Sequence, residues 1–459
     1  MPSLAGNIIS TLAAGPMSGA QLANRLGADT STVNRQLKRL GSEVIRTGAG
    51  RSTLWYRPRS LPLLNGAQRL PIYRVDAMGR SEQIAHLHVV YPVDSYLVEY
   101  FRHGPGVDNV AVPEWDYYES LPWWLTDMRP QGFLGRSFAN QLRTAGQPVD
   151  SDPRLWSEDQ VLAILASHPQ DHVGNLLVGE QAYTRWLQAK PEPLLRDHEA
   201  AERAEAIARG EHFDSSAQGE QPKFTARLGE GECIIKFSGR VERADIDSVA
   251  MRWADLLHAE AVASSVLNLA LPGVAAQGRS YSHNGRTFLA SLRFDRTPEG
   301  GRQGVISLAS LDAEFVGRAN EPWPVIMAAL FDQQVVTEDA LVRCKIAWAF
   351  GQLTANSDMH LGNLSIINSS GRPYTLAPIY DMLPMRFAPK TAGDLPAEPA
   401  EIHIHPMVTR VHWEVAYEPA LQFWAEVLVH PEISDHFKVL AQKQLQIVKE
   451  FASVIARMA

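Results

Sequence analysis

The sequence predicts a protein of the α+β class with more than one domain, and three observations support this. The chain has 459 residues, more than one ordinary hydrophobic core accommodates. Its first 60 residues are basic, whereas the whole chain carries a formal net charge of −8. Beyond residue 71, strand-like and helix-like patterns alternate, and the last third is mainly helical in pattern. We therefore expect an N-terminal module (1–60), a linker (61–71), a mixed α/β lobe (72–295) and a helical lobe (296–459).

Composition indicates a globular protein of a reducing compartment. Apolar residues make up 45% of the chain and charged residues 20%. The two cysteines, Cys233 and Cys344, are far apart and match no metal-binding or redox spacing. No apolar stretch is long enough to cross a membrane, and no secretory leader is evident. We therefore expect a cytoplasmic protein without a membrane partner.

The N-terminal module has the pattern of three helices. The first is expected at residues 4–12. A second, residues 19–26, has Ser18 as a candidate N-cap and ends at Gly27. In the third, residues 31–40, apolar side chains repeat on one face and leave polar and basic side chains outside.

A basic hairpin is expected after these helices. Residues 44–46 and 53–56 have strand character and flank a glycine-containing turn. Eight Lys and Arg residues against two Asp and Glu residues in this module favour an anionic partner. The order resembles winged helix-turn-helix domains, which predicts DNA binding; the alternative is a protein-interaction domain with a basic face. The candidate DNA contacts are Thr32, Asn34, Arg35, Gln36, Lys38, Arg39, Arg46 and Arg51.

Two histidines alternate in the next predicted strand, residues 84–90. His86 and His88 share one face of it, but no acidic residue or cysteine lies near them in the sequence. We therefore interpret them as an exposed stripe rather than as metal ligands.

A lysine in a strand marks the mixed lobe. The polar segment 214–224 leads into the predicted strand 232–237, where Lys236 is flanked by apolar residues. A flexible loop followed by such a strand is typical of sites that cover and pair nucleotide phosphates. Glu260, in a helix expected at about residues 247–269, could pair with Lys236. The alternative is a charge on an edge strand.

The most informative stretch is 354–381. Asp358 precedes Asn363 by five residues, and two short strands, 364–367 and 374–376, lead to Asp381. A tight hairpin would bring these three side chains together. Phosphoryl transfer requires one carboxylate that orients the acceptor hydroxyl. It also requires oxygen ligands for Mg²⁺, which an amide and a second carboxylate can provide. The alternative is that these are ordinary turn residues.

Flanking elements fit the same arrangement. Residues 288–296 have the pattern of a strand that runs into a hinge between lobes. Residues 338–353 have the pattern of a buried helix that leads to Asp358.

Four motifs together resemble the HipA family of serine/threonine kinases, the toxins of type II toxin–antitoxin systems. The N-terminal module makes the chain most similar to the YjjJ/HipH-like proteins of that family, and the resemblance covers about residues 70–440. The motifs are GEQPKF at 219–224, RFDR at 293–296, NSDMHLGN at 356–363 and APIYD at 377–381.

The resemblance implies a bilobal, protein-kinase-like fold and a role for each site residue. Asp358 would be the catalytic base, and Asn363 and Asp381 the Mg²⁺ ligands. Ser216, with Ser215 beside it, would be autophosphorylated, which would inactivate the enzyme. ATP would contact Gln218, Gly219, Glu220, Gln221, Pro222, Lys223, Lys236, Glu260, Leu292, Arg293, Phe294, His360 and Tyr380.

The leading hypothesis is therefore an ATP- and Mg²⁺-dependent serine/threonine protein kinase that also binds DNA. The resemblance implies an aminoacyl-tRNA synthetase as a possible protein substrate and an antitoxin as a possible partner. One alternative is a transcriptional regulator whose kinase-like body senses a ligand without phosphoryl transfer. Another is a DNA-cleaving enzyme that uses Asp358, Asn363 and Asp381 as a metal site.

Overall fold

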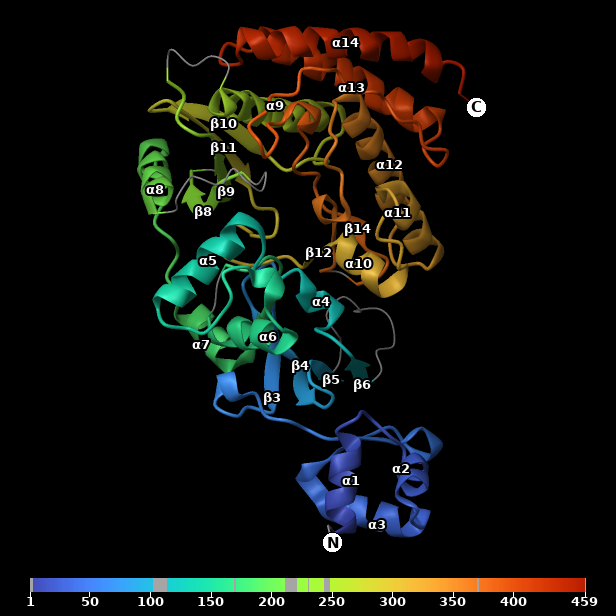
Figure 1. Cartoon of the computed structure of the whole chain (residues 1–459). Helices are drawn as coiled ribbons and strands as arrows, with labels where there is room; N and C mark the ends of the chain where they lie inside the picture. The colour runs from blue at the N-terminus through green and yellow to red at the C-terminus, as the bar shows by residue number, and fades with distance from the viewer. Residues whose placement is uncertain are drawn as a thin grey trace. The chain divides into compact units, whose positions relative to one another are not determined.

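The computed structural model describes residues 3–101, 114–168, 171–210, 221–229, 231–242, 248–369 and 371–458. Two compact units are present (Figure 1). The first consists of Met1–Pro130 and Ala139–Ala189, and the second of Gln131–Phe138 and Lys190–Ala459.

The first unit begins with three helices, α1 (Leu4–Leu12), α2 (Gly19–Leu26) and α3 (Thr30–Leu40). Ser18 caps α2 through a reciprocal capping box, and Gly27 ends it with a φ of 58°. Asp29 caps α3, which therefore starts one residue before the predicted position. An antiparallel hairpin follows, formed by β1 (Ile45–Thr47) and β2 (Leu54–Tyr56). The three helices and the hairpin share one hydrophobic core, which contains Ile8, Leu12, Leu22, Val33, Leu37 and Trp55.

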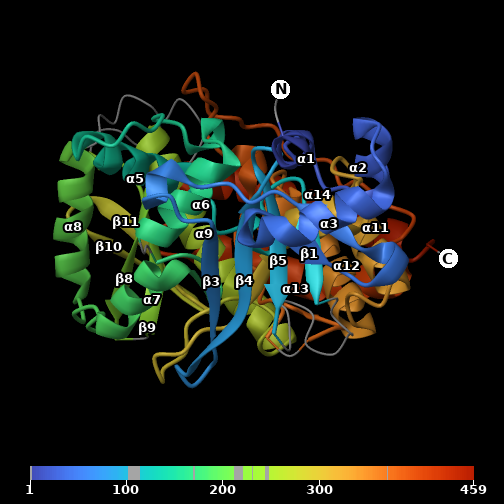
Figure 2. The same ribbon diagram turned by 90° about the horizontal axis from the view of Figure 1, so that it is seen from below.

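A five-stranded antiparallel sheet completes the first unit, in the order β6-β5-β4-β3-β7. Figure 2 shows β3, β4 and β5 side by side. The residues expected to form a linker contain a 3-10 turn, Pro62–Leu64, and the start of β3, because Leu61 and Leu70 are buried. The strands are β3 (Arg69–Val75), β4 (Ser81–Val90), β5 (Ser95–Tyr100), β6 (Trp115–Tyr118) and β7 (Leu176–Val178), and the helices are α4 (Trp123–Thr126), α6 (Glu158–Ser167) and α7 (Gly179–Gln188). Helix α5 spans Gly132–Thr144.

A four-stranded antiparallel sheet, in the order β10-β11-β9-β8, opens the second unit. Helix α8 packs Ala200, Ala201 and Ala204 into the core of this sheet, so one face of the helix is buried. Strand β11 ends at Leu292, so Arg293 to Arg296, which were predicted to continue the strand, lie beyond its end. The elements are α8 (Asp197–Gly210), β8 (Lys223–Leu228), β9 (Gly231–Phe237), α9 (Val249–Ala270), β10 (Gly278–His283) and β11 (Arg286–Leu292).

The remainder of the second unit is mainly helical. Strands β13 (Ser365–Ile367) and β14 (Thr375–Leu376) pair antiparallel, as predicted, and β12 (Val305–Ser307) pairs with β13. Helix α12 spans Glu338–Leu353, the predicted range, and packs against α11 and α13, while α13 packs on α14 (Figure 1). The other helices are α10 (Leu308–Phe315), α11 (Trp323–Asp332), α13 (Arg410–Val429) and α14 (Asp435–Ile455). Within the described residues, no helix has both the length and the apolarity of a membrane span.

Candidate functional site

Three charged side chains meet in the second unit. The Nζ of Lys236, on β9, lies 2.8 and 2.9 Å from the two carboxylate oxygens of Glu260 on α9. The same ammonium contacts Asp381, 145 residues further along the chain. Lys236 is 9% exposed and Glu260 5%. The predicted Lys236–Glu260 pair therefore exists, and Asp381 joins it.

Burial and charge oppose each other in this cluster. Burial alone would raise the pKa of Asp381, but the nearby ammonium groups of Lys236 and Lys223 outweigh it and lower the pKa to about 2. Burial also disfavours the charged form of Lys236, yet the two carboxylates raise its pKa above the usual value. The pKa of Glu260 is raised, because burial and the Asp381 charge together exceed the effect of Lys236. The ammonium of Lys236 thus contacts both carboxylates, with the charge of Lys223 also acting on them.

The loop before β13 holds the other predicted residues. The backbone N–H of Asp358 donates to Asn356 Oδ1 at 3.0 Å, and Asn363 Nδ2 donates to the Asp358 carbonyl at 2.8 Å. This bond uses the Nδ2 of Asn363, so the amide oxygen, Oδ1, is the atom of this side chain that could act as a metal ligand. The Asp358 carboxyl is on the surface of the loop, and partial burial raises its pKa.

Asn356 is a site residue that the sequence analysis did not single out. Its buried amide accepts from Asp358 N–H and donates to the Asp381 carbonyl at 3.3 Å, so it joins the loop of Asp358 to that of Asp381. Asp381 itself has a φ of 54°, a left-handed conformation that non-glycine residues adopt mainly where surrounding contacts enforce it. An asparagine two residues before the candidate base was the available signal.

The amide of Asn363 and the carboxylate of Asp381 are the group that would hold Mg²⁺. Asn363 is bonded to Asp358, Asn356 links Asp358 with Asp381, and the charge of Asp381 acts on the Asp358 carboxyl. Oxygen donors of these two types suit Mg²⁺, which binds through one or two carboxylates and substrate phosphates. The donor set therefore fits the predicted metal.

Aromatic and imidazole groups border the loop. The Tyr380 hydroxyl donates to the Gly362 carbonyl at 3.0 Å and bonds Ser365 Oγ at 2.7 Å, and its ring lies 5.9 Å from that of Phe294. His360 Nδ1 accepts from Gly362 N–H at 3.0 Å. Tyr380, Phe294 and His360 thus lie around the predicted site, the first and last holding the loop shape.

In the segment after β11, a side chain that was predicted to contact ATP makes an internal ion pair instead. The Leu292 and Arg293 amides donate to the carbonyls of Gln277 and Glu232. The Arg293 guanidinium is buried and makes two bonds of 2.9 Å to Asp295. Arg293 therefore has a structural role here, and contact with ATP through its side chain would require breaking a buried ion pair.

The predicted phosphate loop is described only at its end. Gln221 Nε2 donates to the Phe237 carbonyl at 2.9 Å, and the Pro222 carbonyl accepts from Phe237 N–H at 3.1 Å. Lys223 is the β8 neighbour of Lys236. The remaining predicted residues, Ser215, Ser216, Gln218, Gly219 and Glu220, lie outside the described residues.

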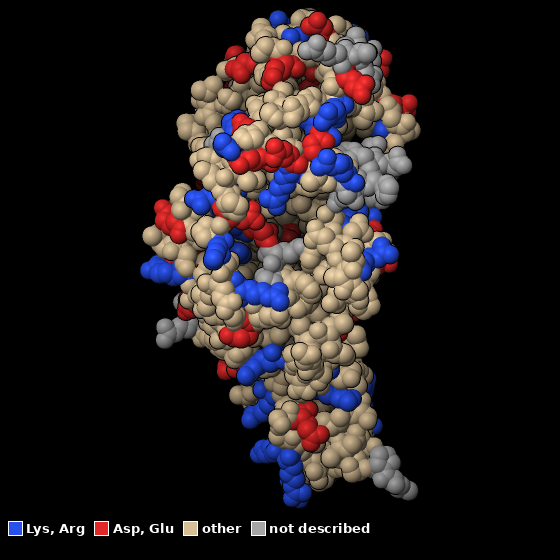
Figure 3. Space-filling view, turned by 90° about the vertical axis from the view of Figure 1, so that its left-hand side faces the viewer, with Lys and Arg blue, Asp and Glu red and all other residues tan. Residues whose placement is uncertain are grey.

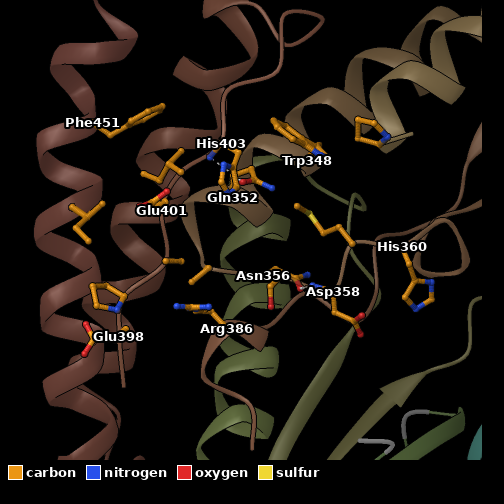
Figure 4. A pocket seen from close by; sticks show the side chains of 18 residues that line it. Trp348, Gln352, Asn356, Asp358, His360, Arg386, Glu398, Glu401, His403 and Phe451 are labelled. Carbon is orange, nitrogen blue, oxygen red and sulfur yellow. Dashed lines mark hydrogen bonds between the residues drawn. The ribbon is translucent and has the colours of Figure 1, made fainter. Parts of the chain in front are cut away.

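A pocket of about 1270 Å³ adjoins Asp358. In Figure 4, Asp358 and His360 lie at one side of it and Glu398 and Glu401 at the other, with Arg386 between them. Trp348, Gln352 and Phe451 line the pocket from α12 and α14. The buried Arg252 guanidinium bonds the carbonyls of Phe387 and Pro396, which fixes the chain just before Glu398. A large pocket with both charged and apolar residues in its lining thus opens beside the candidate base.

The predicted DNA-contacting residues lie on α3 and the β1–β2 hairpin. Four of them, Arg35, Lys38, Arg39 and Arg46, are exposed, as is Arg51 in the turn. Thr32 and Gln36 are half-buried. Figure 3 shows Lys and Arg predominating on one face of the N-terminal module, at the bottom of the view.

Asn34 is placed differently from the prediction. A Cβ on Gly19 would lie 2.2 Å from Asn34 Oδ1, so the Asn34 amide packs against α2 instead of projecting freely. Arg57 and Arg59 do not contribute free positive charge to the basic face either, because both guanidinium groups contact other side chains. The Arg57 guanidinium stacks on Tyr91 at 4.6 Å, and the buried Arg59 pairs with Asp159.

Two domains of known protein families match separate parts of this chain. Residues 66–187 match the middle domain of YjjJ-like toxins, and residues 215–458 match the HipA-like C-terminal domain. The chain is 36% identical over 453 residues to Toxin YjjJ of Escherichia coli, with 97% of each chain covered.

Solved structures give two further likenesses. A chain of the Shewanella oneidensis toxin–antitoxin complex of HipA, HipB and operator DNA has a TM-score of 0.54 at 13% identity, over 84% of this chain and 98% of that one. The Helicobacter pylori proinflammatory kinase CtkA has a TM-score of 0.36 at 13% identity, over 50% of this chain and 92% of that one. The first likeness shows a common fold.

Proposed function

Because the chain belongs to the family of YjjJ-like toxins with a HipA-like C-terminal domain, we propose that it is an ATP- and Mg²⁺-dependent serine/threonine protein kinase. The observation that carries the proposal is the placement of Lys236 between Glu260 and Asp381. In kinases, a strand lysine held by a helix glutamate pairs nucleotide phosphates, and a nearby aspartate binds the metal.

The residues divide the work of phosphoryl transfer. Lys236, held in position by Glu260, would contact the phosphates of ATP. Asp381 and Asn363 would hold Mg²⁺, which neutralises charge on the phosphates when bound. Asp358 would orient the acceptor hydroxyl and take its proton. Its raised pKa makes it a better proton acceptor than an ordinary aspartate.

The pocket beside Asp358 gives the acceptor a place to bind. It is large enough for a peptide segment, and Asp358 lies on its wall. A serine or threonine entering it would lie beside the candidate base. An aminoacyl-tRNA synthetase, which the family resemblance implies, remains the proposed protein substrate.

We also propose, from the relatives of this chain, that it is a toxin and that an antitoxin controls it. The relative at 36% identity is named a toxin, and a structural relative is in complex with HipB and operator DNA, so an antitoxin is a proposed partner. Autophosphorylation at Ser216 or Ser215 would add negative charge just before Gln221 and repel the nucleotide phosphates. The cytoplasm is the proposed location.

The N-terminal module is proposed to bind DNA as a winged helix. Three helices and a β-hairpin in this order, with exposed Arg35, Lys38 and Arg39 on α3 and Arg46 on β1, support it. The alternative, a protein-interaction surface, would use the same charges.

Transfer of labelled γ-phosphate tests the kinase proposal. Pure protein with γ-labelled ATP and Mg²⁺ should label itself or a partner protein. Asp358→Asn should abolish labelling while ATP binding and the melting temperature stay near wild type. Asp394→Asn, a change of an exposed acid in the same lobe, should label normally.

Two other results would replace the proposal. ATP binding without any transfer in the wild type would favour a ligand-sensing regulator. Metal-dependent nicking of plasmid that is lost in Asp381→Ala would favour a DNA-cleaving enzyme.

A further inference from the structure

Three metal-ligating side chains gather on the sheet of the first unit. His86 and His88 lie on β4, and Glu99 lies on the neighbouring strand β5. In the antiparallel register Glu99 is opposite His86, and Leu97 is opposite His88. Side chains two residues apart share a face of a strand, so both imidazoles and the carboxylate are on one face. The histidines were interpreted as an exposed stripe, but both are half-buried, and an acidic residue reaches them from β5.

The distances between their ligand atoms suit a bound ion. Glu99 Oε2 lies 3.3 Å from His88 Nε2 and 3.5 Å from His86 Nδ1. One ligand atom from each residue lies within 4.8 Å of the others. Two ligands at about 2.0–2.2 Å from a tetrahedral Zn²⁺ are about 3.4 Å apart, so small side-chain adjustments would complete the site.

An unsatisfied nitrogen points to a missing partner. His86 Nδ1 is buried and, apart from the ion-pair contact with Glu99 Oε2 at 3.5 Å, has no hydrogen-bond partner among the residues that the structure describes. A buried polar atom of this kind is uncommon in folded proteins and requires an explanation. A metal ion bound between Nδ1 and Glu99 Oε2 would provide one.

Aromatic neighbours hold the two imidazoles. The His86 ring meets Phe101 edge-on at 4.9 Å, and the His88 ring lies 5.5 Å from that of Trp115. The His86, His88 and Glu99 side chains are 21%, 12% and 29% exposed. The group is therefore sheltered but still open to solvent on one side, as entry of an ion requires.

We propose that His86, His88 and Glu99 bind one Zn²⁺ ion, with water in the fourth position. Two neutral imidazoles and one carboxylate form a donor set that suits Zn²⁺ and other borderline transition metals, whereas Mg²⁺ prefers oxygen donors alone. This site is independent of the kinase proposal. Arg69, paired with His88 across β3 and β4, places an opposing positive charge nearby.

The ion would join two strands that support the N-terminal hairpin. Val90 on β4 and Leu97 on β5 form a buried cluster with Tyr56 of β2, and partly buried Ile45 and Leu54 pack on it. Val90 follows His86 and His88 at two-residue spacing, so this contact uses the same face of the sheet. Bound Zn²⁺ would therefore stabilise the strands on which the hairpin of the N-terminal module packs.

Zinc binding by the full-length protein tests the proposal. After treatment with a chelator, the protein should bind one equivalent of Zn²⁺ in competition with a chromophoric chelator, and excess Mg²⁺ should not displace it. Zn²⁺ should raise the melting temperature in a concentration-dependent manner. His88→Ala and Glu99→Gln should each weaken binding at least tenfold. His283→Ala, which changes a histidine on β10 of the other unit, should have no effect.

Two measurements separate a metal site from a hydrogen-bonded pair. Arg69→Gln removes the opposing charge and should tighten Zn²⁺ binding severalfold, which a role in packing alone would not produce. Co²⁺ should give a visible absorption band that is absent in Glu99→Gln. Substoichiometric Zn²⁺ in the wild type, or unchanged affinity in folded His88→Ala and Glu99→Gln variants, would overturn the proposal.

Discussion

The ammonium of Lys236 lies 2.8 Å from Glu260, and it also contacts Asp381 from a loop 145 residues later in the chain. This relationship connects the sheet of the second unit to the loops beside its helices. A buried cation shared by two carboxylates is costly to disturb, because removal of the cation leaves both acids without compensation.

Lys236→Met is expected to destabilise the second unit and abolish phosphoryl transfer. Loss of one partner of a buried ion pair lowers the free energy of unfolding by about 3 kcal/mol. Chemical denaturation of the variant and the wild type would measure this difference. The control Lys190→Met changes an exposed lysine in the same unit. A variant as stable as the wild type would show that the cluster contributes little to folding.

The effect of Lys236→Met on the free energy of unfolding should depend on pH. With Lys236 present, the pKa of Asp381 is about 2, below its unfolded value, so its contribution to stability is present above about pH 4 and is lost as the pH falls through about 2. Without the ammonium this pKa rises and Asp381 takes up a proton at higher pH. The difference in unfolding free energy between wild type and Lys236→Met should therefore be largest near pH 7 and narrow below about pH 4. A difference that widens in acid would contradict this assignment.

Asp381→Asn should raise the Mg²⁺ concentration needed for half-maximal transfer by at least tenfold, since the carboxylate is the charged ligand of the proposed pair with Asn363. Asn363→Asp, which keeps an oxygen donor, should be less impaired than Asn363→Ala. A Mg²⁺ titration at saturating ATP measures all three. Equal Mg²⁺ dependence in Asp381→Asn and wild type would remove Asp381 from the metal site.

The pocket beside Asp358 predicts a preference among acceptors. Glu398 and Glu401 on its far side should favour serine peptides with Lys or Arg near the acceptor over peptides with Glu there. Glu401→Gln should reduce this preference about fivefold, the effect of one exposed ion pair worth about 1 kcal/mol, and leave the KM for ATP unchanged. The control is Asp332→Asn, an exposed change on α11. Equal peptide selectivity in Glu401→Gln and wild type would place the acceptor elsewhere.

DNA binding should depend on the exposed cations of the N-terminal module. Arg35→Ala and Arg51→Ala should each weaken binding about tenfold, and Arg51→Ala should reduce the salt dependence by about one phosphate contact. Asn34→Ala should act mainly on stability, because the Asn34 amide packs against Gly19. Fluorescence anisotropy at several salt concentrations measures these effects, with Arg80→Ala in a distant turn as the control. Unchanged DNA affinity in both arginine variants would favour a protein partner.

Local patterns predicted the elements well. The capping box at Ser18 and the apolar sequence of 338–353 set helix boundaries that the structure reproduces, because such signals act within a few residues. The resemblance to the HipA family is confirmed by the matched domains and by the relative at 36% identity. The mixed α/β fold class is confirmed by the likeness to the HipA complex. The roles of Asp358, Asn363 and Asp381 remain predictions.

Contacts between distant segments could not be predicted in the same way. The positions of helices and strands, and the order of the acids and amides, could be read from the amino-acid sequence, since these depend on neighbouring residues. Tertiary structure decided that Asp381 shares Lys236 with Glu260, that Asn356 joins two loops, that Arg59 pairs internally and that Glu99 meets His86 and His88. Each of these depends on strand register or helix packing, which bring together side chains that no local pattern connects.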